Sequence, residues 1–103
     1  MSSHVAIDQK QLDELCARWK IERLELFGSV IRDDFGPDSD VDVLVTFAPD
    51  ATWSLFDFVR CKADMQALFG RPVDLLTRPA VERSRNRFRR DAILGSAEVL
   101  HGA

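Results

Sequence analysis

The spacing of hydrophobic positions divides the chain into segments that have the periodicity of helices and segments that have the periodicity of strands. After Asp8, apolar residues recur at intervals of three and four, which predicts an amphipathic helix that ends near Lys20. These apolar residues are Leu12, Leu15, Cys16 and Trp19. Asp8, with Gln11 three residues later, has the form of a capping box and places the start of this helix. We expect the helix to be scaffold, with Trp19 packed in the core.

Three segments have strand patterns. Residues 22–27 alternate charged and apolar side chains, and residues 40–47 carry valines at every second position from Val41. Residues 73–76 form a short apolar run, which indicates a strand inside the sheet. Between the first two strands, residues 29–34 are expected to form a short helix that ends at Gly36.

Two further helical regions complete the pattern. From Trp53 to Gly70 a helical stripe predicts a long helix over one face of the sheet, with Leu55, Phe58, Val59, Met65, Leu68 and Phe69 on that stripe. Residues 80–100 are mostly helical by pattern, with a break near Gly95. We therefore predict an α/β (α+β) fold, in which a small mixed sheet of three or four strands has helices packed mainly on one face.

Length and charge narrow the classes of function. The 103 residues suffice for one domain, 1–103, with a helical tail from about residue 80. The net charge of −3 argues against broad, sequence-independent binding of nucleic acid. Residues 78–90 nevertheless contain six arginines and one acid, Glu82. This run is either a solvated helix face or a surface for phosphates or an acidic partner.

The two cysteines, Cys16 and Cys61, lie far apart and have no histidine at metal-ligand spacing. We interpret them as buried thiols of a reducing compartment. The N-terminus lacks the pattern of a signal peptide, and no apolar stretch approaches the roughly 20 residues that span a bilayer. These features predict a cytoplasmic location without membrane contact.

Candidate chemistry gathers around the turn between the first two strands. Gly28 and Ser29 follow an apolar strand, so backbone N–H groups and a hydroxyl there suit a phosphate. Asp40 and Asp42 lie two apart at the start of the next strand, and their carboxylates therefore share one face. Such a pair is also typical of a solvated loop end, but a phosphate cradle followed by paired carboxylates is suited to a nucleotide triphosphate with Mg²⁺.

A third carboxylate, Asp74, lies within the apolar run of residues 73–76. An aspartate inside a buried strand is costly unless it is paired or bound to a cation. This cost favours a position of Asp74 beside Asp40 and Asp42. The alternative is an edge strand with Asp74 facing water.

These motifs together resemble the DNA polymerase β-like nucleotidyltransferase superfamily, and most closely its minimal MNT-type domains. The resemblance rests on Gly28-Ser29, the two aspartates that follow ten residues later, and the later Asp74. Arg32, three residues after Ser29, and Ser39, directly before the first aspartate, match as well. The resemblance covers nearly the whole chain and implies the nucleotidyltransferase fold.

The resemblance also implies residue roles. Asp40 and Asp42 would hold the Mg²⁺ that carries the triphosphate of ATP, and all three aspartates would hold a second Mg²⁺ near the attacking hydroxyl. Asp74 would be the general base. Gly28 and Ser29 would bind the β- and γ-phosphates, Arg32 would stabilise the departing pyrophosphate, and Ser39 would set the geometry of the aspartate after it.

MNT-type domains are typically antitoxins paired with HEPN-domain ribonuclease toxins, and the resemblance implies AMP transfer from ATP to a hydroxyl of that partner. The sequence has no tyrosine, which excludes tyrosine self-modification, while serine, threonine or an RNA end remain open as acceptors. One alternative is a binding module that neutralises a toxin by occlusion. Another is the nucleotide-binding subunit of a two-chain small-molecule nucleotidyltransferase. Homo-oligomerisation stays open.

Overall fold

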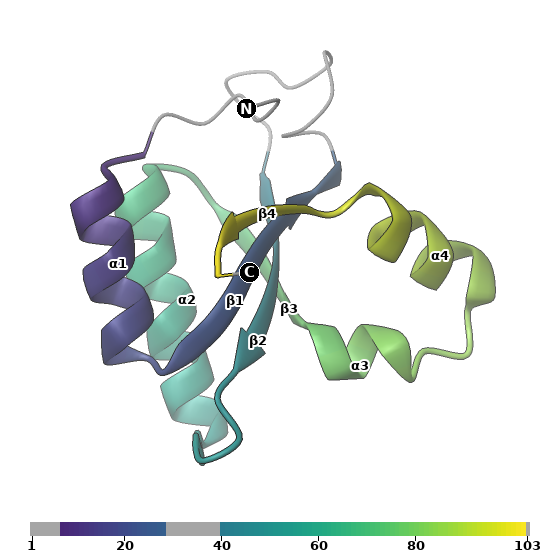
Figure 1. Cartoon of the computed structure of the whole chain (residues 1–103), viewed down its shortest axis with the longest axis horizontal. Helices are drawn as coiled ribbons and strands as arrows, with labels where there is room; N and C mark the ends of the chain where they lie inside the picture. The colour runs from purple at the N-terminus through teal and green to yellow at the C-terminus, as the bar shows by residue number, and fades with distance from the viewer. Residues whose placement is uncertain (1–6, 29–39, 103) are drawn as a thin grey trace.

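A four-stranded mixed sheet forms the centre of the computed structural model, which describes residues 7–28 and 40–102. The strand order is β3-β2-β1-β4, with β2 and β3 parallel and β1 antiparallel to both β2 and β4 (Figure 1). The elements in chain order are α1 (Gln9–Arg18), β1 (Ile21–Phe27), β2 (Val41–Phe47), α2 (Leu55–Phe69), β3 (Val73–Thr77), α3 (Arg78–Glu82), α4 (Arg87–Ser96) and β4 (Glu98–His101). The short helix predicted for residues 29–34 lies outside the described residues.

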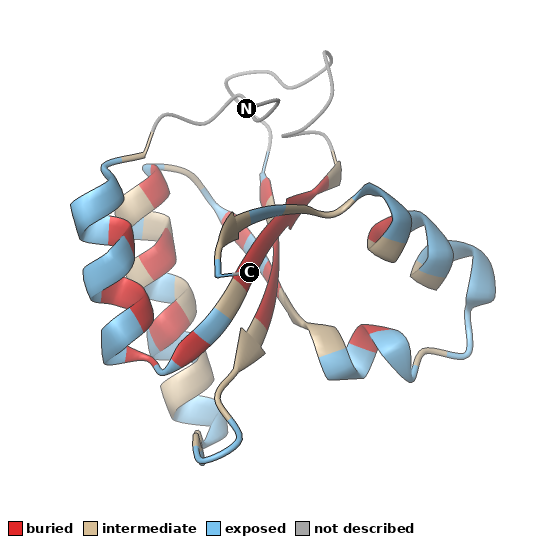
Figure 2. Ribbon diagram, in the orientation of Figure 1, coloured by how far each residue is buried: buried red, intermediate tan, exposed pale blue. Residues whose placement is uncertain are grey.

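Alternate residues of β2 face two different apolar clusters. Val41, Val43 and Val45 belong to the main core beneath α1 and α2. Leu44, on the other face, belongs to a smaller cluster with Val81 of α3 and Ile93 of α4. Figure 1 shows α1 and α2 on one side of the sheet and α3 and α4 on the other, and Figure 2 shows buried positions along the strands and on α1 and α2. The predicted mixed sheet with its helices is confirmed, but the helices cover both faces rather than mainly one, because Leu44 and its neighbours make a second apolar surface that α3 and α4 bury.

The first helix begins and packs as its sequence predicts. The Asp8 carboxylate accepts hydrogen bonds from the backbone N–H groups of Lys10 and Gln11 at 2.9 and 3.3 Å. Leu12, Leu15 and Cys16 are its buried residues. Within the described part of the chain, no helix combines the length and hydrophobicity needed to cross a membrane.

The core stripe of α2 differs from the prediction. Cys61, Met65 and Phe69 are buried, whereas Leu55 and Val59 are 79% and 56% exposed. Val59 precedes Cys61 by two residues, which is roughly 200° around a helix. It therefore faces away from the sheet. The predicted end of this helix is confirmed, because Gly70 adopts a left-handed conformation with φ of 69° directly after it.

Two tryptophans join α1 to the segment before α2. The Trp53 indole N–H donates to the Trp19 carbonyl at 2.9 Å, and the Trp19 indole N–H donates to Asp64 Oδ2 at 2.8 Å. Their rings meet edge to face, with centroids 5.2 Å apart. Trp19 is 9% exposed, which confirms its predicted packing role.

One expectation about the later strands is wrong, and the expected helical tail is incomplete. β3 is an edge strand, and Asp74 is exposed rather than buried. The tail contains a fourth strand, β4, which pairs with β1. The predicted break near Gly95 corresponds to the end of α4 at Ser96. The strand was missed because four residues give little periodicity and because its partner lies far back in the sequence.

Both cysteines are free and buried, as predicted. Burial, reinforced by the negative charge of Asp13, raises the pKa of the Cys16 thiol to about 11. Burial and the charge of Asp64 raise the pKa of Cys61 to about 12. Because thiolate is disfavoured in the folded state, the neutral thiols stabilise the fold below the ordinary pKa of 9.0, and this contribution is lost as pH rises through the folded values.

We expect an ultraviolet titration of the native protein to show thiolate absorption only well above pH 9.0, the ordinary thiol pKa. In denaturant the midpoint should return to the ordinary value. The absence of tyrosine removes the phenolate band that would otherwise obscure this signal. A native midpoint at the ordinary value would show that the thiols are not buried in solution.

Candidate active site

The parallel pairing of β2 and β3 places two of the candidate carboxylates side by side. Asp42 is the direct register partner of Asp74. The Val41 N–H donates to the Pro72 carbonyl at 2.9 Å, which fixes this register at the start of both strands. Neighbouring strands lie about 4.8 Å apart, so the two side chains project from adjacent positions on one face.

That face is the one that carries α3 and α4. Leu44 and Leu76, two residues after Asp42 and Asp74 respectively, both pack in the smaller cluster with Val81 and Ile93. Side chains two apart on a strand share a face, so both carboxylates lie on this side of the sheet. The main core and the helices α1 and α2 occupy the opposite side.

Gly28, directly after β1, lies against the Asp42 carboxylate. Phe27 is the register partner of Asp42, and Gly28 follows it with φ of 73°. A Cβ at Gly28 would overlap Asp42 Oδ2 and would lie 3.1 Å from its Cγ. Glycine is therefore required twice, for the left-handed backbone and for the close approach of the carboxylate. The sequence predicted the turn, and the structure adds the contact with Asp42.

The third predicted ligand is less tightly placed. Asp40 is exposed and directly precedes β2, where strand alternation puts it on the same face as Asp42. Among residues 7–28 and 40–102, no three Asp, Glu, His or Cys side chains converge closely enough to hold a metal ion. The strand register brings two of the predicted ligands, Asp42 and Asp74, side by side, and carboxylate oxygens are the ligands that divalent cations prefer. Ser29, Arg32 and Ser39 lie outside the described residues.

A buried ion pair on the same face was missed by the sequence analysis. Glu25, the register partner of Leu44, is only 2% exposed. Its Oε1 accepts a hydrogen bond from Arg78 Nη1 at 2.7 Å and lies 3.3 Å from Arg23 Nε. The alternating pattern of β1 indicates which face of the sheet Glu25 lies on. It does not indicate which side chain covers Glu25, because Arg78 is 53 residues away in sequence.

Comparisons with known proteins show which sequences this chain is similar to. The family model described as "Nucleotidyltransferase domain" matches residues 8–99. A relative from Methanocaldococcus jannaschii, named "Putative protein adenylyltransferase MJ0435", is 39% identical over 57 residues, which are 55% of this chain and 59% of that relative. The protein adenylyltransferase MntA of Thermococcus cleftensis is 35% identical over 69 residues, which are 67% of this chain and 68% of that relative.

The fold recurs in a solved toxin–antitoxin structure that contains AMP-PNP, with a TM-score of 0.69 and 17% identity over 94% of this chain and 75% of that chain. At this identity the likeness concerns the fold. The family match extends over most of the chain and includes all four strands of the sheet except the last residues of β4. The chain belongs to the nucleotidyltransferase domain family.

Proposed function

We propose that this chain transfers AMP from ATP to a hydroxyl group of a partner protein, and that the partner is a HEPN-domain toxin. The observation that carries the proposal is the register of Asp42 beside Asp74, with Gly28 closed against Asp42. Two carboxylates on adjacent strands can hold the phosphates of a nucleotide through Mg²⁺, and Gly28, which has no side chain, leaves room for those phosphates beside them. The names of the two relatives support protein as the acceptor class.

Different residues of this chain would bind the metal ions, bind the phosphates and position the catalytic carboxylates during the transfer. Asp40, Asp42 and Asp74 would hold Mg²⁺, with two ions as the proposed number, and the metal when bound shields the phosphate charge. Gly28, with Ser29, faces the β- and γ-phosphates. Ser39 positions Asp40, and Arg32 pairs with pyrophosphate as it leaves.

Asp74 is the proposed general base. It accepts the proton of the acceptor hydroxyl, whose oxygen forms a bond to the α-phosphorus while the bond from that phosphorus to pyrophosphate breaks. Its exposure on the edge strand β3 leaves it accessible to a hydroxyl supplied by another molecule. A buried Asp74 would have been screened from such an acceptor.

An acceptor on a second protein agrees with two observations. The sequence contains no tyrosine, so a tyrosine acceptor must come from another chain. The structural neighbour with AMP-PNP is a toxin–antitoxin assembly, which supports a toxin as the partner. The proposal is therefore an antitoxin that acts by covalent modification of its toxin.

The test compares two labels in one assay. The purified chain is incubated with Mg²⁺, the protein encoded by the neighbouring gene, and ATP labelled at either the α- or the γ-phosphate. We expect label on the partner from α-labelled ATP only, because AMP is transferred and pyrophosphate departs. A chelator should abolish the labelling.

Transfer of the γ-label would indicate a kinase and contradict the proposal. A stable complex with the partner but no label from either ATP would instead support neutralisation by occlusion. Label on a small molecule bound by the partner, rather than on protein, would support the two-chain small-molecule enzyme.

A further inference from the structure

A cavity of about 160 Å³ lies on the same face of the sheet, between α3 and α4 and next to Leu76 of β3. Its lining residues are Leu76, Ala80, Val81, Ser84, Arg89, Arg90 and Ile93. Leu76 follows Asp74 by two residues on the same face, so the cavity begins roughly 7 Å along the strand from the carboxylate pair. It is neither part of the main core nor part of the carboxylate site.

The strand order sets the order in which the candidate site residues lie across the sheet. Gly28 at the end of β1, Asp42 on β2 and Asp74 on β3 lie in sequence across the sheet. A triphosphate whose terminal phosphates lie at Gly28 brings its α-phosphate to Asp42 and Asp74. The nucleoside can then extend along the same face of the sheet from Asp74 toward Leu76, where the cavity begins.

From this juxtaposition we infer that the cavity between β3, α3 and α4 is the subsite for the purine base of the nucleotide. The inference rests on the proposed nucleotidyl transfer, because it places the base of the same substrate. An apolar cavity of about 150 Å³ accepts a benzene ring, and this cavity is open on one side, so a bicyclic base can enter with one edge toward solvent.

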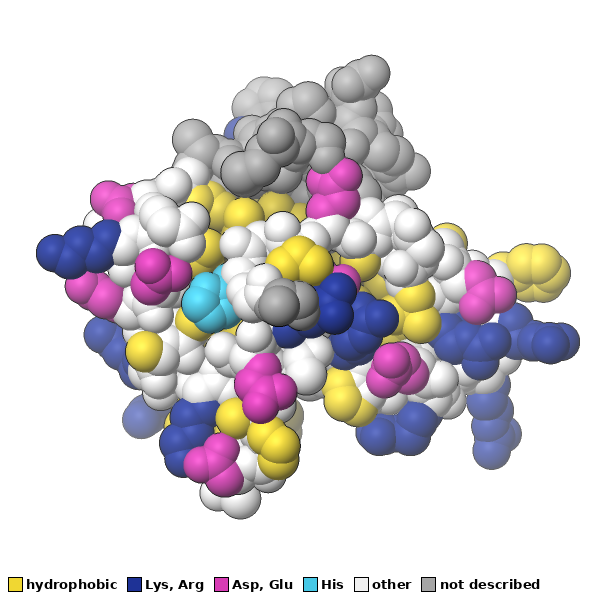
Figure 3. Space-filling view, viewed as in Figure 1, with side chains coloured by type: hydrophobic (Ala, Val, Ile, Leu, Met, Phe, Trp, Pro, Cys, Tyr) yellow, Lys and Arg dark blue, Asp and Glu magenta, His cyan; other side chains and the backbone are white. Residues whose placement is uncertain are grey.

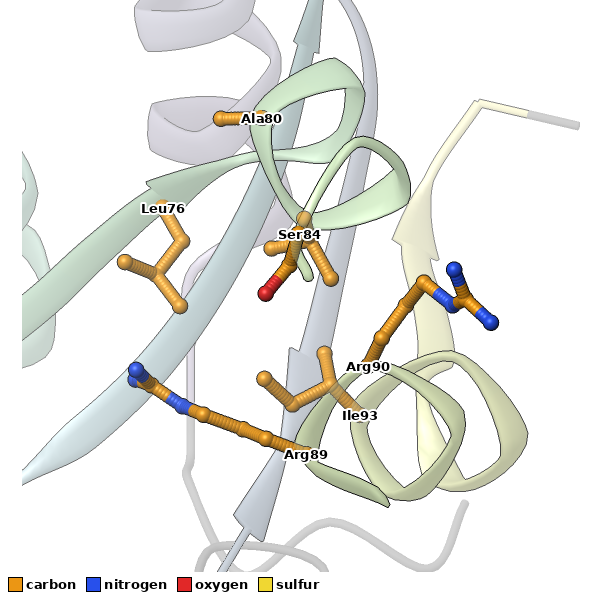
Figure 4. Close-up of a pocket in the computed structure, with 7 residues that line it drawn as sticks. Leu76, Ala80, Ser84, Arg89, Arg90 and Ile93 are labelled. Atoms are coloured by element: carbon orange, nitrogen blue, oxygen red, sulfur yellow. The ribbon is translucent and has the colours of Figure 1, made fainter. Parts of the chain in front are cut away.

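The lining offers an apolar floor and two polar groups. Figure 4 shows the Ser84 hydroxyl and the Arg89 side chain directed toward the space between Leu76 and Ile93, whereas Arg90 extends toward β4. Ser84 Oγ accepts a hydrogen bond from the Asn86 N–H at 3.3 Å, which leaves its own proton to donate to a ring nitrogen. Leu76 and Ile93 supply the apolar contacts.

The guanidinium group of Arg89 is suited to stacking on the ring plane of a nucleotide base. Arg90 pairs with Asp91 at 3.3 Å, while Arg89 makes no ion pair with the described residues. A planar guanidinium stacks on aromatic rings and donates hydrogen bonds in that plane. Figure 3 shows Lys and Arg side chains gathered over α3 and α4, and Arg89 is the member of this group that reaches the cavity without an ion-pair partner.

The test separates base recognition from phosphate recognition. Ala80→Trp fills the cavity from an exposed helical position, and Ala92→Trp, at an exposed position of α4 outside the lining, is its matched control. Titration calorimetry measures binding of Mg²⁺·ATP and of Mg²⁺·tripolyphosphate, which has no base. We expect Ala80→Trp to weaken ATP binding at least about tenfold and to leave tripolyphosphate binding unchanged, because base stacking commonly contributes a factor of that size.

A second pair of variants tests the polar contact without filling space. Arg89→Ala should also weaken ATP binding selectively, and Arg87→Ala, on the same helix but outside the lining, should not. Unchanged ATP affinity in both Ala80→Trp and Arg89→Ala would overturn the inference. Reduced labelling of the partner protein at unchanged ATP affinity would also overturn it and would assign the cavity to the acceptor.

The inference and the proposed function can fail separately. Selective loss of ATP binding in Ala80→Trp, together with a wild type that transfers no AMP, supports the base subsite and contradicts the transfer. AMP transfer by the wild type, with both Ala80→Trp and Arg89→Ala binding ATP normally, supports the transfer and contradicts the subsite. A wild type that binds tripolyphosphate as tightly as ATP contradicts the subsite directly.

Discussion

Replacing Asp42 with asparagine is expected to lower the rate of AMP transfer at least about 100-fold, the scale on which loss of one key electrostatic contact acts. Asparagine keeps the shape of the side chain and so preserves the contact with Gly28. It removes the negative charge that, with Asp74 in the adjacent register position, would hold the cation. The initial rate of label transfer to the partner measures this effect.

The same substitution should leave the free energy of unfolding unchanged or slightly higher in the absence of metal. Two like charges in adjacent register positions repel, and the substitution relieves that repulsion. Asp50→Asn is a matched control, because Asp50 lies beyond the other end of β2 and pairs with Lys20 at the surface, 3.2 Å apart. It should transfer AMP at the wild-type rate. An Asp42→Asn variant that fails to fold, or that transfers normally, would contradict a functional role for Asp42.

Replacing Arg78 with methionine is expected to lower the free energy of unfolding by about 3 kcal/mol. Arg78 donates the shortest contact to the Glu25 carboxylate, which is almost completely buried. Without Arg78, that carboxylate would retain only Arg23, whose Nε is 3.3 Å away and makes no hydrogen bond. A buried charge without its main partner costs much more than the pair itself contributes. Urea denaturation measures the loss.

The double variant Glu25→Leu with Arg78→Met should recover most of this stability. An apolar pair of similar volume needs no compensation for a buried charge, and such replacements are often neutral or stabilising. The two substitutions should therefore be strongly non-additive in a double-mutant cycle. Additive losses would show that Glu25 and Arg78 act independently. Arg60→Met, at an exposed position of α2, controls for loss of an arginine as such.

Local patterns in the sequence were sufficient for most of the elements. The helix after Asp8, the strand before Gly28 and the helix that ends at Gly70 depend on side-chain periodicity and on caps, which act within a few residues. The strand order could not be inferred in the same way. It is set by pairings such as β1 with β4, between segments far apart in the chain.

Asp74 lies beside Asp42 for a reason other than the burial that the sequence suggested. The apolar run around it indicated a buried strand, yet β3 lies at the edge and Asp74 is exposed. Val73 and Leu75 are apolar because they face the main core, and this requirement holds equally at an edge. The position of Asp74 beside Asp42 comes instead from the parallel register, which the sequence alone does not specify.

The contact between Trp19 and Trp53 has a consequence for spectroscopy of this protein. These are its two tryptophans, and both pack against the main core, on the face of the sheet opposite Asp42 and Asp74. Indole emission depends on its immediate surroundings, here the neighbouring ring and the Asp64 carboxylate. The intrinsic fluorescence therefore reports the docking of α1 and α2. Nucleotide titrations can be followed in the same cuvette with an extrinsic signal, and the two readouts remain separate.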